Sequence, residues 1–276
     1  MTFSQLKPGR VRAYLDAARE GSRSGDLWVF QHIPKTAGSS LAAELAANRR
    51  PYRNLHIGMG SAGGAETALK PDAQRDVVVR EFLDDPLSRE VRSVSGHLRY
   101  ANIETLKAEI SDMRLFTFVR EPVSRVVSEY YYCLSPLHNN PEGFRKAFPT
   151  LNDFANSLEA SNKMAVYIAD RRGIRPDDLV ALAFERFDFI GSQKLYGLSF
   201  RVLSSLLWYE TQSEQKLRVA GSKPSKQALD PETVRTIRQN NRADIALFNA
   251  VSDVYRACRD ELIAELKRRA RERMQA

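Results

Sequence analysis

A short loop that combines small residues, hydroxyl groups and one lysine is the first part of the sequence that could do chemistry. It reads HIPKTAGSS, from His32 to Ser40. Small residues let backbone N–H groups approach an anion, and the N-terminus of a following helix adds unpaired donors and partial positive charge. Lys35 adds a mobile full charge. The pattern predicts a phosphate site, although an ordinary turn with an N-capping serine explains it equally well.

A second candidate anion site reads FVREPVSRVVSEY, from Phe118 to Tyr130. Arg120 is expected at the end of a strand, and Ser128 on the helix that begins near Pro122. An arginine and a serine from adjoining elements can hold a phosphate from two sides. Taken alone, such a pair more often serves surface ion pairing and helix capping.

A histidine could supply the base for a reaction of an acceptor hydroxyl. His97, in SGHLRY, is the best placed of the four histidines, because it follows a short strand and a glycine at the same expected sheet edge. His32 is predicted to be structural. His56 and His138 fall in expected loops with no supporting residues around them.

Apolar runs alternate with helical patterns along the chain, which predicts a parallel sheet with helices on both sides. Ligands of such folds bind beyond the carboxyl ends of the strands, where the three candidate segments fall. Residues 51–68 are predicted to be a loop and residues 134–152 an irregular insertion. The expected strands cover residues 27–33, 92–95, 114–119 and 187–190, and the expected helices cover residues 39–50, the segment after Pro122 and the tail from Pro231.

Composition narrows the class of protein. The 42 Lys and Arg residues exceed the 34 Asp and Glu residues, giving a net charge of +8 that favours anionic partners. Cys133 and Cys258 are far apart, so neither a disulfide framework nor a zinc site is indicated. Residues 1–20 lack the apolar stretch of a signal peptide, and no later run spans a bilayer, which favours a cytoplasmic protein.

The first loop resembles the 5′-phosphosulfate-binding loop of sulfotransferases that use 3′-phosphoadenosine 5′-phosphosulfate (PAPS). The similarity is to the branch that contains heparan sulfate and uronyl 2-O-sulfotransferases and bacterial carbohydrate sulfotransferases. In that family the lysine contacts the bridging and sulfuryl oxygens, and the loop amides and hydroxyls hold the 5′-phosphate. The matching positions here are Lys35, Thr36, Ala37, Gly38, Ser39 and Ser40.

Two further segments carry the resemblance. The pattern R-[DE]-P-x-x-R-x-x-S-x-[YF] is similar to the family's 3′-phosphate motif and implies that Arg120 and Ser128 bind that phosphate. The GHLRY segment resembles the element that holds the family's proposed base, which implies this role for His97. Heparan sulfate 2-O-sulfotransferases have a second histidine two residues earlier, where this chain has Ser95, so the resemblance does not imply the same acceptor.

Weaker similarities extend over roughly Leu27 to Tyr255. SNKMAVYI, at Ser161–Ile168, resembles a stretch near the family's acceptor cleft, and FIGSQK is similar to a structural strand of the family. The GSKPSK loop lies where the family closes a polar or basic loop over the nucleotide, so Lys223 is a candidate phosphate contact.

The resemblance implies one sulfotransferase domain over residues 1–276, with a three-layer fold related to P-loop kinases. It implies PAPS as donor, adenosine 3′,5′-bisphosphate (PAP) as product, a carbohydrate or other hydroxyl acceptor, no metal and no nucleic acid. Two alternatives stay open. An ATP-dependent kinase is disfavoured because Lys35 precedes the glycine, whereas a Walker loop has G-x-x-x-x-G-K-[ST]. A non-catalytic protein that binds anionic glycans is suggested only by net charge.

Overall fold

The protein is built on one five-stranded sheet whose strands are all parallel. The computed structural model describes residues 2–24, 26–57, 71–207 and 229–275. The strand order is β2-β3-β1-β4-β5, so the first strand of the chain lies at the centre of the sheet, between β3 and β4. The strands are β1 (Leu27–Gln31), β2 (Tyr52–Asn54), β3 (Ser93–Gly96), β4 (Met113–Val119) and β5 (Phe189–Ser192).

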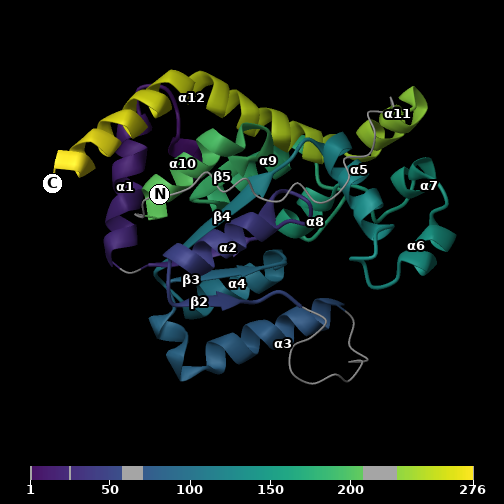
Figure 1. Cartoon of the computed structure of the whole chain (residues 1–276), viewed down its shortest axis with the longest axis horizontal. Coiled ribbons are helices and arrows are strands. Elements are labelled where there is room, and N and C mark those ends of the chain that lie inside the picture. The colour runs from purple at the N-terminus through teal and green to yellow at the C-terminus, as the bar shows by residue number, and fades with distance from the viewer. Residues whose placement is uncertain (1, 25, 58–70, 208–228, 276) are drawn as a thin grey trace.

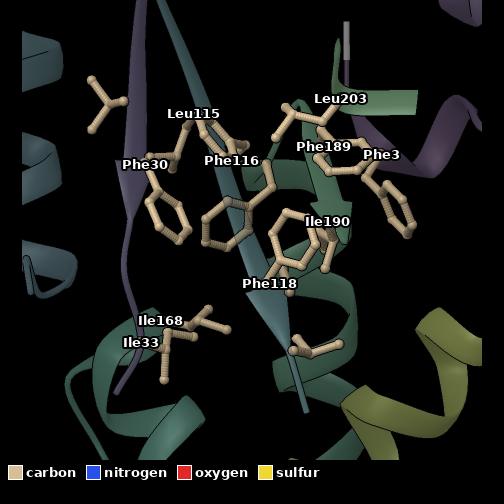
Figure 2. Packing of buried hydrophobic residues seen from close by; sticks show 14 of the residues in the cluster. Phe3, Phe30, Ile33, Leu115, Phe116, Phe118, Ile168, Phe189, Ile190 and Leu203 are labelled. Carbon is tan, nitrogen blue, oxygen red and sulfur yellow. The ribbon is translucent and has the colours of Figure 1, made fainter. Parts of the chain in front are cut away.

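The central strands are buried along nearly their whole length, as expected for a parallel sheet covered on both faces. The register places Phe30 beside Phe116 and Phe116 beside Phe189, so one aromatic row crosses β1, β4 and β5. The rings of Phe30 and Phe116 stack with centroids 4.9 Å apart. Figure 2 shows this row at the centre of the core, with Phe118 and Ile190 beside it.

Helices fill the connections between strands and flank the sheet. Helix α2 packs on β2 and β3, whereas the long α12 runs past α9, α10 and β5 to reach α1, as Figure 1 shows at the top of the molecule. The α-helices are α1 (Val11–Ser24), α2 (Gly38–Asn48), α3 (Pro71–Asp84), α4 (Tyr100–Glu109), α5 (Pro122–Cys133), α6 (Pro141–Ala147), α7 (Leu151–Ala155), α8 (Lys163–Ala169), α9 (Pro176–Arg186), α10 (Tyr196–Leu207), α11 (Pro231–Asn240) and α12 (Arg242–Gln275). The described ranges also contain the short 3₁₀ helices η1 (Phe3–Gln5), η2 (Pro86–Glu90) and η3 (Gln193–Leu195).

The predicted α/β fold with a parallel sheet is confirmed, with local corrections. Part of the segment predicted to be a loop, residues 51–68, is strand β2, which pairs with β3 through residues of low hydrophobicity. The region 134–152, predicted to be irregular, contains α6, because Asn140 caps a helix that has a proline at its first position. Within the described ranges, none of the helices is both long and apolar enough to cross a membrane.

Candidate active site

The strand order brings the three candidate segments to neighbouring positions. Strand β1 lies between β3 and β4, and the carboxyl ends of parallel strands meet at one edge of the sheet. The loop before α2 follows β1, His97 follows β3, and Arg120 follows β4. The two candidate anion-binding segments are in contact, because Arg120 Nη1 donates a hydrogen bond to the backbone oxygen of Lys35 at 3.1 Å.

The loop that follows β1 has an unusual backbone. Lys35 and Ala37 have φ angles of 66° and 89°, in the left-handed region that residues other than glycine rarely adopt. The buried Thr36 hydroxyl donates to Ile33 O at 2.8 Å, which fixes the turn. Ala37 occupies the N-cap position of α2 without a side-chain hydrogen bond to the first turn. Among the described residues, no side chain accepts from the N–H groups of this first turn, which suits an anion.

Gly38 is needed because the loop folds closely over His32. A Cβ atom added at Gly38 would lie 1.7 to 2.3 Å from three atoms of the His32 ring. A contact of that length cannot be accommodated without moving the ring or the start of α2. The His32 ring can therefore pack on the start of α2 only because residue 38 has no side chain.

Gly38→Ala is expected to lower the free energy of unfolding by about 1 to 3 kcal/mol, because the added methyl group overpacks against His32. The matched control is Gly197→Ala in α10, where an added Cβ meets nothing within 4 Å and alanine favours the helix. Chemical denaturation of both variants measures the difference. Equal stability of the two variants would contradict the close packing of His32 on Gly38.

Arg120 has hydrogen-bonding capacity to spare. Its Nε is buried and has no hydrogen-bond partner among the described residues, although Nη1 is bonded to the loop. Burial, and then the charge of Arg125, lower the pKa of Arg120 from its usual value. An unpartnered guanidinium N–H in such a place is costly unless an acceptor reaches it.

Helix α5 supplies the remaining candidate for the second anion site. Glu121 caps this helix by accepting from the backbone N–H groups of Val123 and Ser124, and it also accepts from the Ser124 hydroxyl. Ser124 is therefore engaged at the helix start. Ser128, one turn further, is half-buried and makes no hydrogen bond through its hydroxyl within the described part of the chain.

The ammonium group of Lys35 lies over the ring of Tyr132, with Nζ 3.9 Å from the ring centroid. This cation–π contact holds the side chain against α5. Burial, followed by the nearby charge of Arg120, lowers the pKa of Lys35, and the carboxylate of Glu129 partly offsets this effect. Sequence reasoning missed Tyr132, whose position one residue before the end of α5 gives no local signal of a contact with the loop.

His97 is oriented by the backbone of the first loop. Its Nδ1 lies 2.7 Å from His32 O, and because a carbonyl oxygen only accepts, Nδ1 carries the proton. The lone pair is then on Nε2. Burial lowers the pKa of His97, and the charges of Arg75, Lys163 and Lys35 contribute to the shift. The ring is thus neutral near pH 7 and can accept a proton.

The structure places two more histidines beside His97. His32 Nδ1 and His56 Nε2 are 2.7 Å apart, and His56 Nδ1 is 2.5 Å from Asn54 Oδ1. The expectation that His56 had no supporting residues was wrong. Strand β2, which the sequence did not reveal, carries His56 to the edge of the sheet where His32 and His97 lie. His32 packs inside the loop, as predicted for a structural residue, but it also contacts both other rings.

A buried ionic network lies behind these groups. Glu129 accepts from Arg125 Nη1 and from Lys163 Nζ, both at 2.6 Å. Arg125 and Lys163 lower the pKa of Glu129 against the effect of its burial, so it stays ionised. Lys163 begins α8, in the segment whose similarity pointed to the acceptor cleft. Lys223, the remaining candidate contact, lies outside the described residues.

Comparison with known proteins agrees with this geometry. The model of the sulfotransferase family matches residues 26–187, which is more than half of the chain and includes both candidate anion-binding segments and His97. No curated protein matches the chain significantly. The chain therefore belongs to the sulfotransferase family, whose members are PAPS-dependent enzymes.

Proposed function

We propose that this sulfotransferase transfers the sulfuryl group of PAPS to a hydroxyl of a carbohydrate acceptor, such as a polysaccharide or glycolipid. The observation that carries the proposal is the 3.1 Å hydrogen bond from Arg120 to the backbone of Lys35. It joins the segment that resembles a 5′-phosphosulfate loop to the segment that resembles a 3′-phosphate motif. One nucleotide with phosphates on both sides of its ribose can then contact both segments.

The residues at this place fit PAPS. In the part of the chain that the structure describes, the buried Arg120 Nε has no acceptor and the first turn of α2 has no side-chain cap, so both offer N–H donors to phosphate oxygens. The proposed contacts of the 3′-phosphate are Arg120 and Ser128, and Lys223 is a proposed contact of the nucleotide. The proposed contacts of the 5′-phosphosulfate are Lys35, Thr36, Ala37, Gly38, Ser39 and Ser40.

The proposed reaction is an in-line transfer. PAPS supplies the sulfuryl group when it is bound, and PAP is the product. Lys35 provides positive charge for the leaving oxygen, and its partial burial strengthens that interaction relative to water. His97 accepts the proton of the acceptor hydroxyl at Nε2, while its Nδ1–H stays bonded to His32 O. Neither role requires a metal ion.

The surroundings of His97 support an acceptor that carries negative charge. Arg75 donates through Nε to the backbone oxygen of His97 at 2.8 Å, and Lys163 and Lys35 are close enough to lower the pKa of His97. Asp72 and Glu129 balance part of the charge of Arg75 and Lys163, and Lys35 adds its own positive charge. Uronic acids and sulfated sugars present such charge beside free hydroxyls. The similarity to carbohydrate sulfotransferases supports a sugar hydroxyl as the acceptor group.

The direct test is transfer of labelled sulfate from PAPS to a panel of anionic glycans, neutral glycans and small alcohols, with the Lys35→Ala protein as control. We expect transfer to at least one anionic glycan. Transfer confined to small alcohols would contradict the carbohydrate proposal, and absence of transfer to every acceptor would contradict the activity.

Arg120→Lys is expected to weaken PAP binding about tenfold to a hundredfold, because lysine keeps the charge but loses the fork of donors on the phosphate and on the Lys35 backbone. Titration calorimetry with PAP measures the change. Arg89→Lys, at an exposed position in η2, is the matched control and should bind PAP like the unaltered protein. Unchanged affinity of the Arg120→Lys protein would remove Arg120 from the nucleotide site.

A further inference from the structure

Three histidine rings meet at the carboxyl ends of three neighbouring strands. His32 follows β1, His97 follows β3, and His56 lies two residues beyond β2. The ring centroids are 4.2 Å apart for His32 and His97, 4.5 Å for His56 and His97, and 5.0 Å for His32 and His56. The three rings come together because β2, β3 and β1 are neighbours in the sheet and their carboxyl ends lie at the same edge.

A glycine permits the close approach of these strand ends. A Cβ atom at Gly96 would lie 2.8 Å from the backbone oxygen of Leu55, so a larger residue would push β3 away from the segment that precedes His56. The rings of His56 and His97 can therefore lie against each other.

Two of the rings are held through Nδ1, so Nε2 is the nitrogen that each could offer to an ion. Nε2 of His56 lies 2.7 Å from Nδ1 of His32 and would exchange that contact for the ion. His97 donates through Nδ1 to His32 O, and His56 donates through Nδ1 to the side-chain oxygen of Asn54. Metal-binding histidines are held in this way, with one ring N–H on a carbonyl and the other nitrogen on the ion. One nitrogen from each of the three rings lies within 4.8 Å of the other two.

We propose that His32, His56 and His97 form a binding site for a divalent cation of the Zn²⁺ type, and that an ion bound there inhibits sulfuryl transfer. The three ligands are Nδ1 of His32 and Nε2 of the other two histidines. An ion about 2.0 to 2.1 Å from each nitrogen needs the nitrogens roughly 3.3 Å apart in a tetrahedral site. For an ion to bind, Nδ1 of His32 and Nε2 of His56 must separate from their 2.7 Å contact, and the nitrogen of His97, which lies within 4.8 Å of both other rings' ligand atoms, must adjust to the same spacing.

The donor set decides the kind of cation. Three neutral imidazoles suit Zn²⁺, Cu²⁺ or Ni²⁺, whereas Mg²⁺ requires oxygen ligands. The proton on Nδ1 of His32 moves to Nε2 of the same ring when the ion binds, so the ring stays neutral and coordinates through Nδ1. A fourth position of the ion is open to water.

The inhibition rests on the proposed function. The nitrogen of His97 that would coordinate the ion is the one that would accept the acceptor's proton, and one lone pair cannot do both. Zinc is therefore expected to lower turnover without weakening PAP binding at Arg120, which uses other groups.

Binding is tested without PAPS or acceptor, on the full chain without an affinity tag. Competition with a chromophoric zinc chelator should show one saturable zinc ion per chain, and Mg²⁺ in excess should not displace it. His56→Gln removes one ligand and should abolish this binding. Asn54→Ala keeps all three ligands but releases the His56 ring, and should weaken zinc binding about tenfold or more. Equal zinc affinity of the unaltered and His56→Gln proteins would overturn the site.

Assays of sulfate transfer with and without zinc test the metal site and the proposed function separately. Zinc should inhibit sulfate transfer by the unaltered protein, a chelator should restore it, and the His56→Gln protein should transfer sulfate at the basal rate in the presence of zinc. Saturable zinc binding by a protein that never transfers sulfate would support the site and contradict the proposed function. Sulfate transfer that zinc does not inhibit would overturn the inhibitory role of the ion.

Discussion

Replacement of Lys35 by alanine is expected to lower the rate of sulfate transfer about 100- to 1,000-fold, the usual cost of removing one group that stabilises charge in the transition state. The leaving phosphate oxygen gains negative charge as the sulfuryl group departs. Lys35 is the side chain of the first loop that carries a full positive charge, and its ammonium is partly buried against the ring of Tyr132. Water that replaces it would stabilise the oxygen less well, because it must reorient during the reaction.

The fold should survive this change. Lys35 has a φ of 66°, and alanine pays a similar backbone cost in that conformation, so the loop keeps its shape while the charge is lost. The measurements are single-turnover transfer of labelled sulfate and thermal unfolding. Lys194→Ala, at an exposed position in η3, is the matched control and should match the unaltered protein in both. A Lys35→Ala protein that transfers sulfate at the control rate would show that the lysine does not act on the leaving group.

The sequence predicted the central strands because their burial is encoded locally. The run that forms β1 is apolar or aromatic up to the final Gln31, and most of β4 is too, as expected for strands covered on both faces. Strand β2 has no such signal. Its sequence is YRN, its residues are exposed or half-buried, and it exists because it pairs with β3. At this edge of the sheet, pairing with β3 determines that the segment is a strand, and no local sequence pattern indicates that pairing.

The missed strand also explains why part of the site was missed. Without β2, nothing in the sequence places His56 near His97, which lies 41 positions further along the chain. The ion pair of Lys163 was equally hard to predict, because its partner Glu129 lies on α5, far away in the sequence. One signal was readable and was overlooked. Asn140 followed by Pro141 is a capping residue before a proline at the first helical position, which is typical of the start of a helix such as α6.

The relative position of the two candidate anion-binding segments was predictable because each segment is compact in sequence. Lys35 to Ser40 and Arg120 to Ser128 each follow a strand that is itself predictable, and neighbouring parallel strands bring their ends together. The contact between Arg120 and the Lys35 backbone then follows from topology. The sequence could not show that Ser124 is engaged by Glu121, which leaves Ser128 as the serine of that helix face with an uncommitted hydroxyl.

Replacement of His97 by asparagine is expected to lower the turnover number about 100- to 10,000-fold, the range over which a positioned general base contributes. Asparagine tests the role of His97 better than alanine does, because its side-chain amide can still donate to His32 O in place of the Nδ1–H group. The loop should therefore keep its geometry and only the proton acceptor is removed. PAP binding should stay unchanged, since it depends on Arg120 and the start of α2.

Steady-state kinetics combined with PAP titration separate a chemical role of His97 from a structural one. A base that acts in the transition state lowers the turnover number and leaves the affinity for PAP intact, whereas a histidine that only supports the loop would weaken PAP binding when it is replaced. His138→Asn, in the turn after α5, is the matched control because His138 hydrogen-bonds locally, to the backbone N–H of Asn140. If the His97→Asn protein loses PAP affinity in proportion to turnover, His97 positions the loop and the proton goes to another acceptor.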